Sequence, residues 1–504
     1  MFRTTQSRRV RTALVAAAVV AGVLTTSGMA EAGIGPVRGA AGIGDSYYPA
    51  YGNGGYDVIH YDVKLKYQPT TDQLEGTTTI KAKTKQHLSA FNLDFALDVS
   101  SVTVNGRPAV YERNGEHELT ITPDRAIRNH TEITVVVQYA GIPSKVLVDG
   151  WSAWKRTSDG ALAVGEPEIS WWWYPSNDHP QDKATHAITV TVPEGVEAIS
   201  NGVLTVQPTT TDGWATWRWR SKKPMAPYLA FVAIGQYQIE NTTAPNGQPV
   251  TYAFAENLGE YADNARASIR RTPEIIDWAS KLFGPYPFEA QGGVAAPLDG
   301  IGFALENQTR PVYSWKFWRK GPNPYVVVHE LAHQWYGDNV SVHDWRNIWL
   351  NEGFAAYAEW LWSEQHGEGT AQEIFDTSFA KLPAEHSFWQ VAPGDPGADA
   401  LFNSAVYNRG AMALHQIRLA VGDKKFFAVL TGWGKHKRYR TATIEEFRAY
   451  MERLSGKDLQ SVFDTWLFTK GKPVMSDTTP KAAPVEPASW DMLMNSHEHS
   501  SHEH

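Results

Sequence analysis

The sequence predicts an α+β protein of several domains, in which an N-terminal antiparallel β domain precedes a mainly helical domain. Three observations support this fold class. The chain has 504 residues, which is more than one compact domain usually contains. From about Tyr47 to Glu240, apolar and polar residues alternate as they do in half-buried strands. From about Asn257 onward, apolar residues recur instead with helical spacing.

The first 32 residues have the pattern of a secretory signal peptide. An arginine-rich start is followed by a short apolar run from Leu14 to Leu24 and by the small-residue cleavage pattern Ala30-Glu31-Ala32. The apolar run is too short to span a bilayer comfortably, which argues against a membrane anchor. We therefore expect a secreted, extracellular protein whose mature chain begins near Gly33.

The export route stays open between two alternatives. Ser7-Arg8-Arg9 resembles part of a twin-arginine signal, but Arg11 and Thr12 stand where that signal usually carries bulky apolar residues. The general secretory route is therefore an equal expectation.

Composition excludes several classes of partner. Removal of the signal segment takes away four arginines and one glutamate, which would change the formal net charge from −8 to −11. An acidic chain of this kind has no basic surface for nucleic acid. No later apolar run is long enough for a membrane span, and the absence of cysteine excludes disulfides and thiolate-bound metals. The sequence does not specify an oligomeric state, and a monomer is the default expectation.

The β domain is expected over residues 47–245, after a Gly/Ala-rich and flexible lead-in over residues 33–46. Its strand pattern is clearest where Tyr61, Val63, Leu65 and Tyr67 alternate with charged residues. Similar patterns cover residues 131–137 and 187–192. Asn-Gly steps at 53–54, 105–106 and 201–202 are typical of turns between strands.

The second domain is expected over residues 246–472. Its predicted helices are Ala265–Phe283, Pro324–Tyr336, Glu352–Gln365, Asn408–Val421, Ile444–Leu454 and Asp458–Phe468. Thr443 is a predicted N-cap, with Glu446 three residues further on as its partner in a capping box. Residues 473–504 are rich in Pro, Thr, Ala and Glu and end in a His-rich segment, so we expect a disordered tail there. The histidines of this tail could bind metal weakly, although a solvated tail without a catalytic role is the better interpretation.

One helix carries the pattern of a metal site. His329 and His333 lie four residues apart in the segment His-Glu-Leu-Ala-His, so they project from one face of a helix and can bind one metal ion. Glu330 lies beside them and can reach a metal-bound water. Glu352, at the start of the next apolar helix, supplies a third ligand. Two imidazoles and one carboxylate leave the fourth position of a tetrahedral Zn²⁺ open, as catalytic rather than structural zinc sites do.

A solvated helix that happens to carry His and Glu is the alternative interpretation of this short motif. The neighbouring residues argue against it, because Val326, Val327, Val328, Leu331 and Trp335 make the helix apolar on most sides. Imidazole and carboxylate groups on a buried helix need a partner or a metal ion. We therefore expect one Zn²⁺ per chain.

Further segments resemble the aminopeptidase N family of zinc metallopeptidases, the gluzincins with an HExxH-x18-E signature. The resemblance covers about residues 55–475 and is carried by residues 329–337, 349–355, 303–307, 283–288 and 224–230. It implies an N-terminal β domain followed by a thermolysin-like catalytic domain with a small sheet and a helical lower half. The chain resembles the short secreted bacterial type, because only about thirty residues follow Lys472, too few for the C-terminal helical domain that often roofs the cleft.

The resemblance also implies roles for two further glutamates. Glu306 stands where the family binds the free α-amino group of the substrate, and Glu166 stands where some members supply a second amine-binding side chain. A protonated amine in a partly dry cleft needs such a carboxylate partner. Phe303 and Leu305 depart from the Gly and Met that are usual around Glu306, and Phe303 places the shape of the first substrate pocket in question.

Tyr407 matches the catalytic tyrosine of the family, whose phenol can stabilise the oxyanion of the tetrahedral intermediate. With Glu330 as general base, the resemblance implies a secreted, zinc-dependent aminopeptidase that acts on peptides with a free N-terminus. An endopeptidase with the same zinc site, a non-catalytic binding protein of this fold and a bifunctional epoxide hydrolase are the alternatives. Glu306 argues against the endopeptidase, and retention of Glu330, Tyr407 and the zinc ligands argues against the binding protein.

Overall fold

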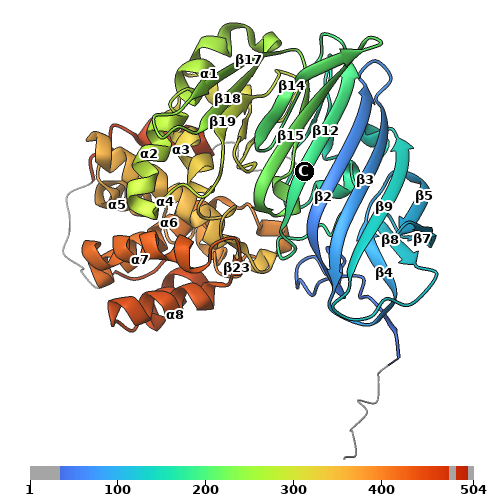
Figure 1. The fold of residues 1–504 in the computed structure, drawn as a ribbon. Helices are drawn as coiled ribbons and strands as arrows, with labels where there is room; N and C mark the ends of the chain where they lie inside the picture. The colour runs from blue at the N-terminus through green and yellow to red at the C-terminus, as the bar shows by residue number, and fades with distance from the viewer. Residues whose placement is uncertain (1–34, 149, 476–483, 498–504) are drawn as a thin grey trace, which may run out of the picture. The chain divides into compact units, whose positions relative to one another are not determined.

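The computed structural model describes residues 35–148, 150–475 and 484–497. The predicted signal peptide and the last histidines of the tail lie outside these residues. Residues from Pro36 onward form one compact unit. In this unit, strands dominate the N-terminal half and helices the C-terminal half (Figure 1). The predicted fold class, a β domain followed by a mixed catalytic domain, is confirmed.

The first half is built around an eight-stranded sheet. In sheet order its strands are β14 (Val203–Thr211), β15 (Trp214–Met225), β12 (Ala184–Pro193), β2 (Tyr56–Gln68), β3 (Gln73–Thr84), β9 (Glu132–Gly141), β5 (Asp98–Val104) and β6 (Arg107–Pro108). Neighbouring strands are antiparallel except for β12 and β2, which are parallel. In β2 the four apolar residues of the predicted alternation are all buried. One face of this strand therefore packs on the core, as its pattern predicts.

Two smaller sheets complete this half. The first, in sheet order, contains β1 (Val37–Arg38), β4 (Leu88–Asp94), β8 (Glu118–Thr122) and β7 (Val110–Asn114). The second contains β10 (Trp154–Arg156), β11 (Ala161–Ala163), β16 (Val232–Gly235) and β13 (Glu197–Ser200).

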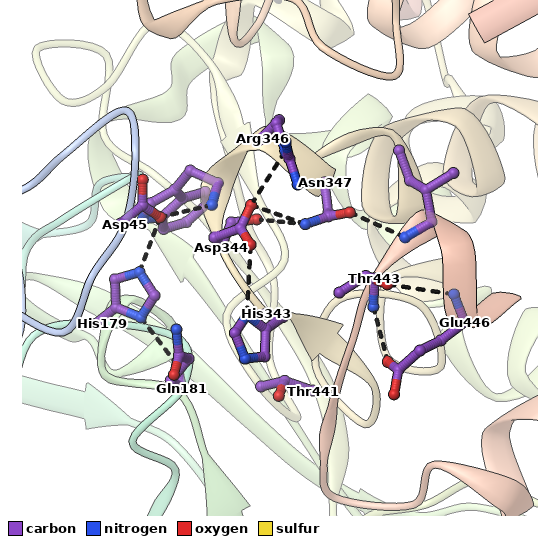
Figure 2. A network of polar contacts seen from close by, with 12 residues as sticks. Asp45, His179, Gln181, His343, Asp344, Arg346, Asn347, Thr441, Thr443 and Glu446 are labelled. Atoms are coloured by element: carbon purple, nitrogen blue, oxygen red, sulfur yellow. Dashed lines mark hydrogen bonds and ion pairs between the residues drawn. The ribbon is translucent and has the colours of Figure 1, made fainter. Parts of the chain in front are cut away.

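The prediction of a flexible lead-in over residues 33–46 is wrong for its described part. Strand β1 pairs in parallel with β4. The Asp45 side chain is fully buried, with Oδ2 3.0 Å from His179 Nε2 and accepting a 2.7 Å hydrogen bond from the backbone N–H of Trp345 (Figure 2). Gly/Ala composition suggests mobility, but these long-range polar contacts hold the segment, and a local pattern cannot reveal them.

The second half contains the predicted small sheet. Its strands, in sheet order, are β17 (Tyr237–Thr243), β18 (Pro249–Ala255), β19 (Gln291–Ala295), β21 (Val312–Tyr313) and β20 (Ala304–Leu305). A short parallel pair, β22 (Ser341–Val342) and β23 (Thr441–Ala442), lies among the helices.

The predicted helices are present with shifted bounds. The helices of this half are α1 (Ala262–Ile269), α2 (Thr272–Phe283), α3 (Pro324–Ala332), α4 (Trp349–His366), α5 (Ala371–Lys381), α6 (Ser404–Val421), α7 (Asp423–His436), α8 (Ile444–Ser455) and α9 (Gln460–Phe463). The stretch predicted as one helix is split into α1 and α2, since a proline lies in the first turn of α2, where it is tolerated. The capping box of Thr443 and Glu446 is confirmed (Figure 2).

The prediction of a disordered tail over residues 473–504 is wrong for helix α10 (Trp490–His497). Ser489 joins this helix to the catalytic half, because its Oγ lies 2.8 Å from Ser363 Oγ and its N–H donates to the Glu368 carbonyl over 3.0 Å. Leu493 is buried. Trp490 is buried as well, so two apolar side chains within a polar tail dock this short helix. Within the described parts of the chain, no helix is both long and apolar enough to cross a bilayer.

Candidate active site

Helix α3 places the two histidines of the metal motif in the interior. The Asn323 side chain accepts hydrogen bonds from the N–H groups of Tyr325 and Val326, and Pro324 occupies the first turn, so the start of the helix is well capped. All residues of α3 after Pro324 are buried. His333 is the C-cap and keeps helical backbone angles, so the four-residue spacing still sets both imidazoles on one face.

The three predicted zinc ligands converge on one point. Glu352 Oε2 lies 3.2 Å from His329 Nε2 and 3.5 Å from His333 Nε2. Ligands bonded to one Zn²⁺ at about 2.0–2.2 Å would be separated by about 3.3–3.6 Å in a tetrahedral site. The observed spacing matches this value, so the three side chains fit zinc without rearrangement.

A second layer of acceptors orients both imidazoles. Glu359 Oε1 lies 2.7 Å from His329 Nδ1, and the Tyr336 carbonyl oxygen lies 3.0 Å from His333 Nδ1. Each Nδ1 therefore donates a proton to an oxygen, and each Nε2 is left to face the metal. Sequence reasoning missed Glu359. The sequence does contain an indication of its role, because Glu359 follows Glu352 by seven residues on the same face of an otherwise apolar helix.

A close crossing of α4 and α6 brings Tyr407 to the site. A Cβ added to Gly410 would lie 3.0 Å from the Cα of Gly353 and 2.7 Å from a ring carbon of Trp349, so two glycines allow the helices to meet. The Tyr407 ring consequently stacks on His329, with centroids 5.8 Å apart and planes 22° apart. Burial and the surrounding carboxylates raise the pKa of the Tyr407 phenol, which keeps the phenol protonated as a hydrogen-bond donor.

Glu330 and Glu306 lie close to the metal ligand His333. Oxygen atoms of both carboxylates and a ring nitrogen of His333 all lie within 4.8 Å of one another. Burial raises the pKa of Glu330 to about 8. Glu306 Oε1 accepts a 3.1 Å hydrogen bond from the hydroxyl of Tyr228, a positioning residue that the sequence did not reveal.

Glu166, from the β domain, lies close enough to these site residues to interact with them electrostatically. It lies in the segment between β11 and the 3-10 turn Ser170–Trp172 and is 5% exposed. Its Oε1 has no hydrogen-bond partner among the described residues. Burial, followed by the negative charges of Glu306 and Glu352, raises the pKa of Glu166. The structure therefore buries Glu166 among the other carboxylates of the site and does not leave it on the surface.

Phe303, which stands where the family usually has Gly, and Arg409, close to Tyr407, have different structural roles. Phe303 is half-buried and packs against the core immediately before β20, so its ring does not occupy open solvent. Arg409, two residues after Tyr407, is fully buried and donates hydrogen bonds to backbone carbonyls. The acceptors are the carbonyl oxygens of Trp389, Val391, Thr465, Trp466 and Thr469. Arg409 therefore fastens the first turns of α6 to two other segments.

The fold and the site together define a metallohydrolase with a two-histidine, one-glutamate centre. Two family profiles match the chain: the Peptidase M1 N-terminal domain over residues 58–229 and the Peptidase family M1 domain over residues 319–466. The chain belongs to the M1 family of zinc metallopeptidases. Zinc is the cofactor that this family implies, and the donor set described above fits it.

Solved structures and characterised relatives agree with this assignment. An M1 zinc metallopeptidase from Deinococcus radiodurans superimposes with a TM-score of 0.75 at 28% identity, covering 88% of this chain and 99% of that one. A mutant of that protein bound to a Tyr-Ser-Ala substrate gives a TM-score of 0.74. Glutamyl aminopeptidases of Rattus norvegicus and Homo sapiens are 24% and 26% identical over 83% of this chain. The chain spans about half of their length, 48% and 47% respectively.

Proposed function

We propose that this protein is a secreted, zinc-dependent aminopeptidase that hydrolyses the N-terminal peptide bond of peptides. The observation that carries the proposal is the pair of buried carboxylates, Glu306 and Glu166, beside Glu330 and His333. Two buried acids without a cation are electrostatically costly. A protonated α-amino group entering this cavity would neutralise them.

Different residues of the site carry out different steps of the proposed reaction. A zinc ion bound by His329, His333 and Glu352 would supply a Lewis acid and an activated water. Glu330 takes the proton of the attacking water and then delivers it to the leaving amine. The Tyr407 hydroxyl donates a hydrogen bond to the oxyanion that forms on the scissile carbonyl.

Exopeptidase specificity follows from the position of the amine-binding carboxylates. Glu306 and Glu166 hold the N-terminal ammonium group, so only the first carbonyl of a peptide can reach Glu330 and Tyr407. A substrate bound at an internal peptide bond places neutral backbone, and no ammonium group, beside Glu306 and Glu166. The two carboxylates would then be buried without a cationic partner, which is unfavourable.

Acetylation of the substrate amine tests this assignment. We expect kcat/KM for an acetylated aminoacyl substrate to fall at least about 100-fold below that of the free amine, or roughly 3 kcal/mol. Glu306→Ala should cost the free-amine substrate a similar factor and the acetylated substrate almost nothing, because the coupling needs both charges. Glu260→Gln, a charge change on an exposed residue, is the matched control.

An endopeptidase would give the opposite pattern. Equal cleavage of free and acetylated substrates, or internal cuts in denatured casein, would reject the aminopeptidase assignment while leaving the zinc site intact. Chelator-resistant activity would reject the zinc mechanism itself.

Secretion is proposed from the first 32 residues. The mature protein should be found in the culture medium with an N-terminus near Gly33, as read by N-terminal sequencing. Intact Met1 on cytosolic protein would contradict export. We further propose that the enzyme acts as a monomer, which sedimentation analysis would test.

A further inference from the structure

A second cluster of metal-binding residue types lies in the β domain, away from the motif helix. Asp94 ends β4 and Glu118 begins β8, and these residues face each other directly in the antiparallel register of the two strands. His117 immediately precedes Glu118. Donor atoms of Asp94, His117 and Glu118 all lie within 4.8 Å of one another.

Two carboxylate oxygens of this cluster accept no hydrogen bond from the described residues. Asp94 is fully buried, and its Oδ2 accepts hydrogen bonds from Asn53 Nδ2 over 3.0 Å and from the N–H of Asp178 over 2.7 Å. Its Oδ1, and Oε1 of Glu118, are buried without a hydrogen bond to any described residue. Buried polar atoms are normally hydrogen-bonded or bound to an ion. A cation bound between these two oxygens would therefore stabilise the cluster.

Among the described residues, no lysine or arginine forms an ion pair with either carboxylate. Arg113, on the neighbouring strand β7, donates instead to the carbonyls of Phe95 and Leu97. Burial, followed by the charge of Glu118, raises the pKa of Asp94, while burial raises the pKa of Glu118 to about 7. Burial lowers the pKa of His117, which favours the neutral imidazole that binds metals.

The imidazole is held at the cluster by its neighbours. Its ring packs against Trp171 with centroids 4.7 Å apart and against the edge of Tyr51 at 5.8 Å. His117 Nε2 lies 3.8 Å from Asp94 Oδ1 and 3.2 Å from the carbonyl oxygen of Ala50, to which an Nε2–H would donate a hydrogen bond. An ion bound to Nε2 would replace that proton and leave the carbonyl oxygen facing the ion. These separations are close to those of ligands that share one metal ion with bonds of about 2.0–2.3 Å.

We propose that Asp94, His117 and Glu118 bind a divalent transition-metal ion, with the Ala50 carbonyl as a further oxygen donor. One imidazole nitrogen with carboxylate and carbonyl oxygens suits Mn²⁺ or Zn²⁺. Ala50 belongs to the segment that follows β1, whereas the other donors lie on β4 and at the start of β8. The ion would therefore connect the N-terminal segment to this small sheet, which is a structural role separate from peptide hydrolysis.

Titration of the zinc-loaded protein with Mn²⁺ tests the proposal. The electron paramagnetic resonance signal of free Mn²⁺ measures how much is bound. We expect about one Mn²⁺ per chain beyond the zinc already present, and at least about tenfold weaker binding in Glu118→Gln and Asp94→Asn. Glu116→Gln is the matched control, because it removes the same charge from an exposed side chain two residues away. Every variant retains the histidines of the tail, so a difference between variants cannot come from them.

Thermal unfolding gives a second readout. Bound Mn²⁺ should raise the unfolding temperature of wild type and Glu116→Gln by at least about 2 °C, but not that of Glu118→Gln. Circular dichroism and unchanged peptide hydrolysis would show that the variants are folded. If wild type binds no additional Mn²⁺, or if Glu118→Gln binds it as tightly as wild type, the proposal is wrong and the two acids instead retain protons.

Discussion

At the scale of single residues, three groups of the site, His329, His333 and Glu306, are oriented by a partner outside the predicted site. Glu359 and the Tyr336 carbonyl fix the two imidazoles, and Tyr228 fixes Glu306. The metal ligands and Glu330 could be predicted from the sequence because the metal motif has a fixed local spacing, whereas Tyr407, Glu306 and Glu166 were identified only through the family resemblance. Tyr228 could not, because nothing in the chain near residue 228 reveals that it will contact residue 306.

Replacement of the general base should separate binding from chemistry. In Glu330→Gln the amide cannot accept the proton of the attacking water, so we expect kcat to fall by at least about 100-fold, within the usual range for a general base. Zinc content, measured by atomic emission, should stay at one per chain. Turnover within threefold of wild type would remove Glu330 from this role.

The oxyanion donor should affect kcat rather than substrate binding. Tyr407→Phe keeps the ring that stacks on His329 but removes the hydroxyl, and the loss of one such donor usually costs about 10²–10³ in kcat. Steady-state kinetics would measure this. A change confined to KM would instead identify Tyr407 as a binding residue.

The carboxylate behind His329 should govern zinc affinity. Glu359→Gln weakens the acceptor on Nδ1, and loss of such an outer partner typically lowers metal affinity by about 10–100-fold. Competition with a chelator of known affinity would measure the change. Unaltered affinity would mean that packing alone orients His329.

At the scale of elements, the geometry of the site depends on how closely α4 and α6 approach. Helical spacing in the sequence predicted both helices, since apolar periodicity is a local property. The crossing could not be predicted in the same way, because it depends on Gly353 and Gly410 meeting across 57 residues of chain with Trp349 packed between them.

An alanine at this crossing should loosen the site. The added methyl of Gly410→Ala meets the buried Trp349 ring and the backbone of Gly353, and overpacking of this kind costs about 1–3 kcal/mol. Urea unfolding should show the loss of stability, and kcat should fall because Tyr407 lies one turn away. If Gly410→Ala has the same free energy of unfolding as wild type, helices α4 and α6 can move apart without a loss of stability.

At the scale of the whole molecule, the sequence predicted the order of the β-rich and helical halves. It did not predict the long-range contacts that hold the N-terminal segment and α10 in place. Strand alternation and helical periodicity identify the two halves, whereas the lead-in and α10 were both predicted to be disordered from composition alone. Each segment is held by a few contacts with residues far away in the sequence. Asp45 with His179 and Trp345, and Ser489 with Ser363 and Glu368, are such contacts.

Removal of the Asp45 carboxylate should destabilise both halves together. Asp45→Ala leaves the N–H of Trp345 and the ring of His179 buried without their acceptor, at about 1–3 kcal/mol for each unsatisfied group. A single cooperative unfolding transition at lower denaturant concentration is expected. Asp62→Ala, in a more exposed pair with Lys64, is the control and should change the midpoint little.

The bond between Asp45 and Trp345 also has a consequence for the time course of folding. The two residues are separated by 300 positions, so Asp45 leaves the ribosome long before Trp345, whose N–H donates this hydrogen bond, has been made. Contacts of such wide sequence separation form slowly, because a long loop must close first. Pairing of β1 with β4 and the contact of Asp45 with His179 need only the N-terminal half, whereas the bond to Trp345 must wait until the C-terminal half has folded. Closure of this last bond would thus be among the late steps of folding.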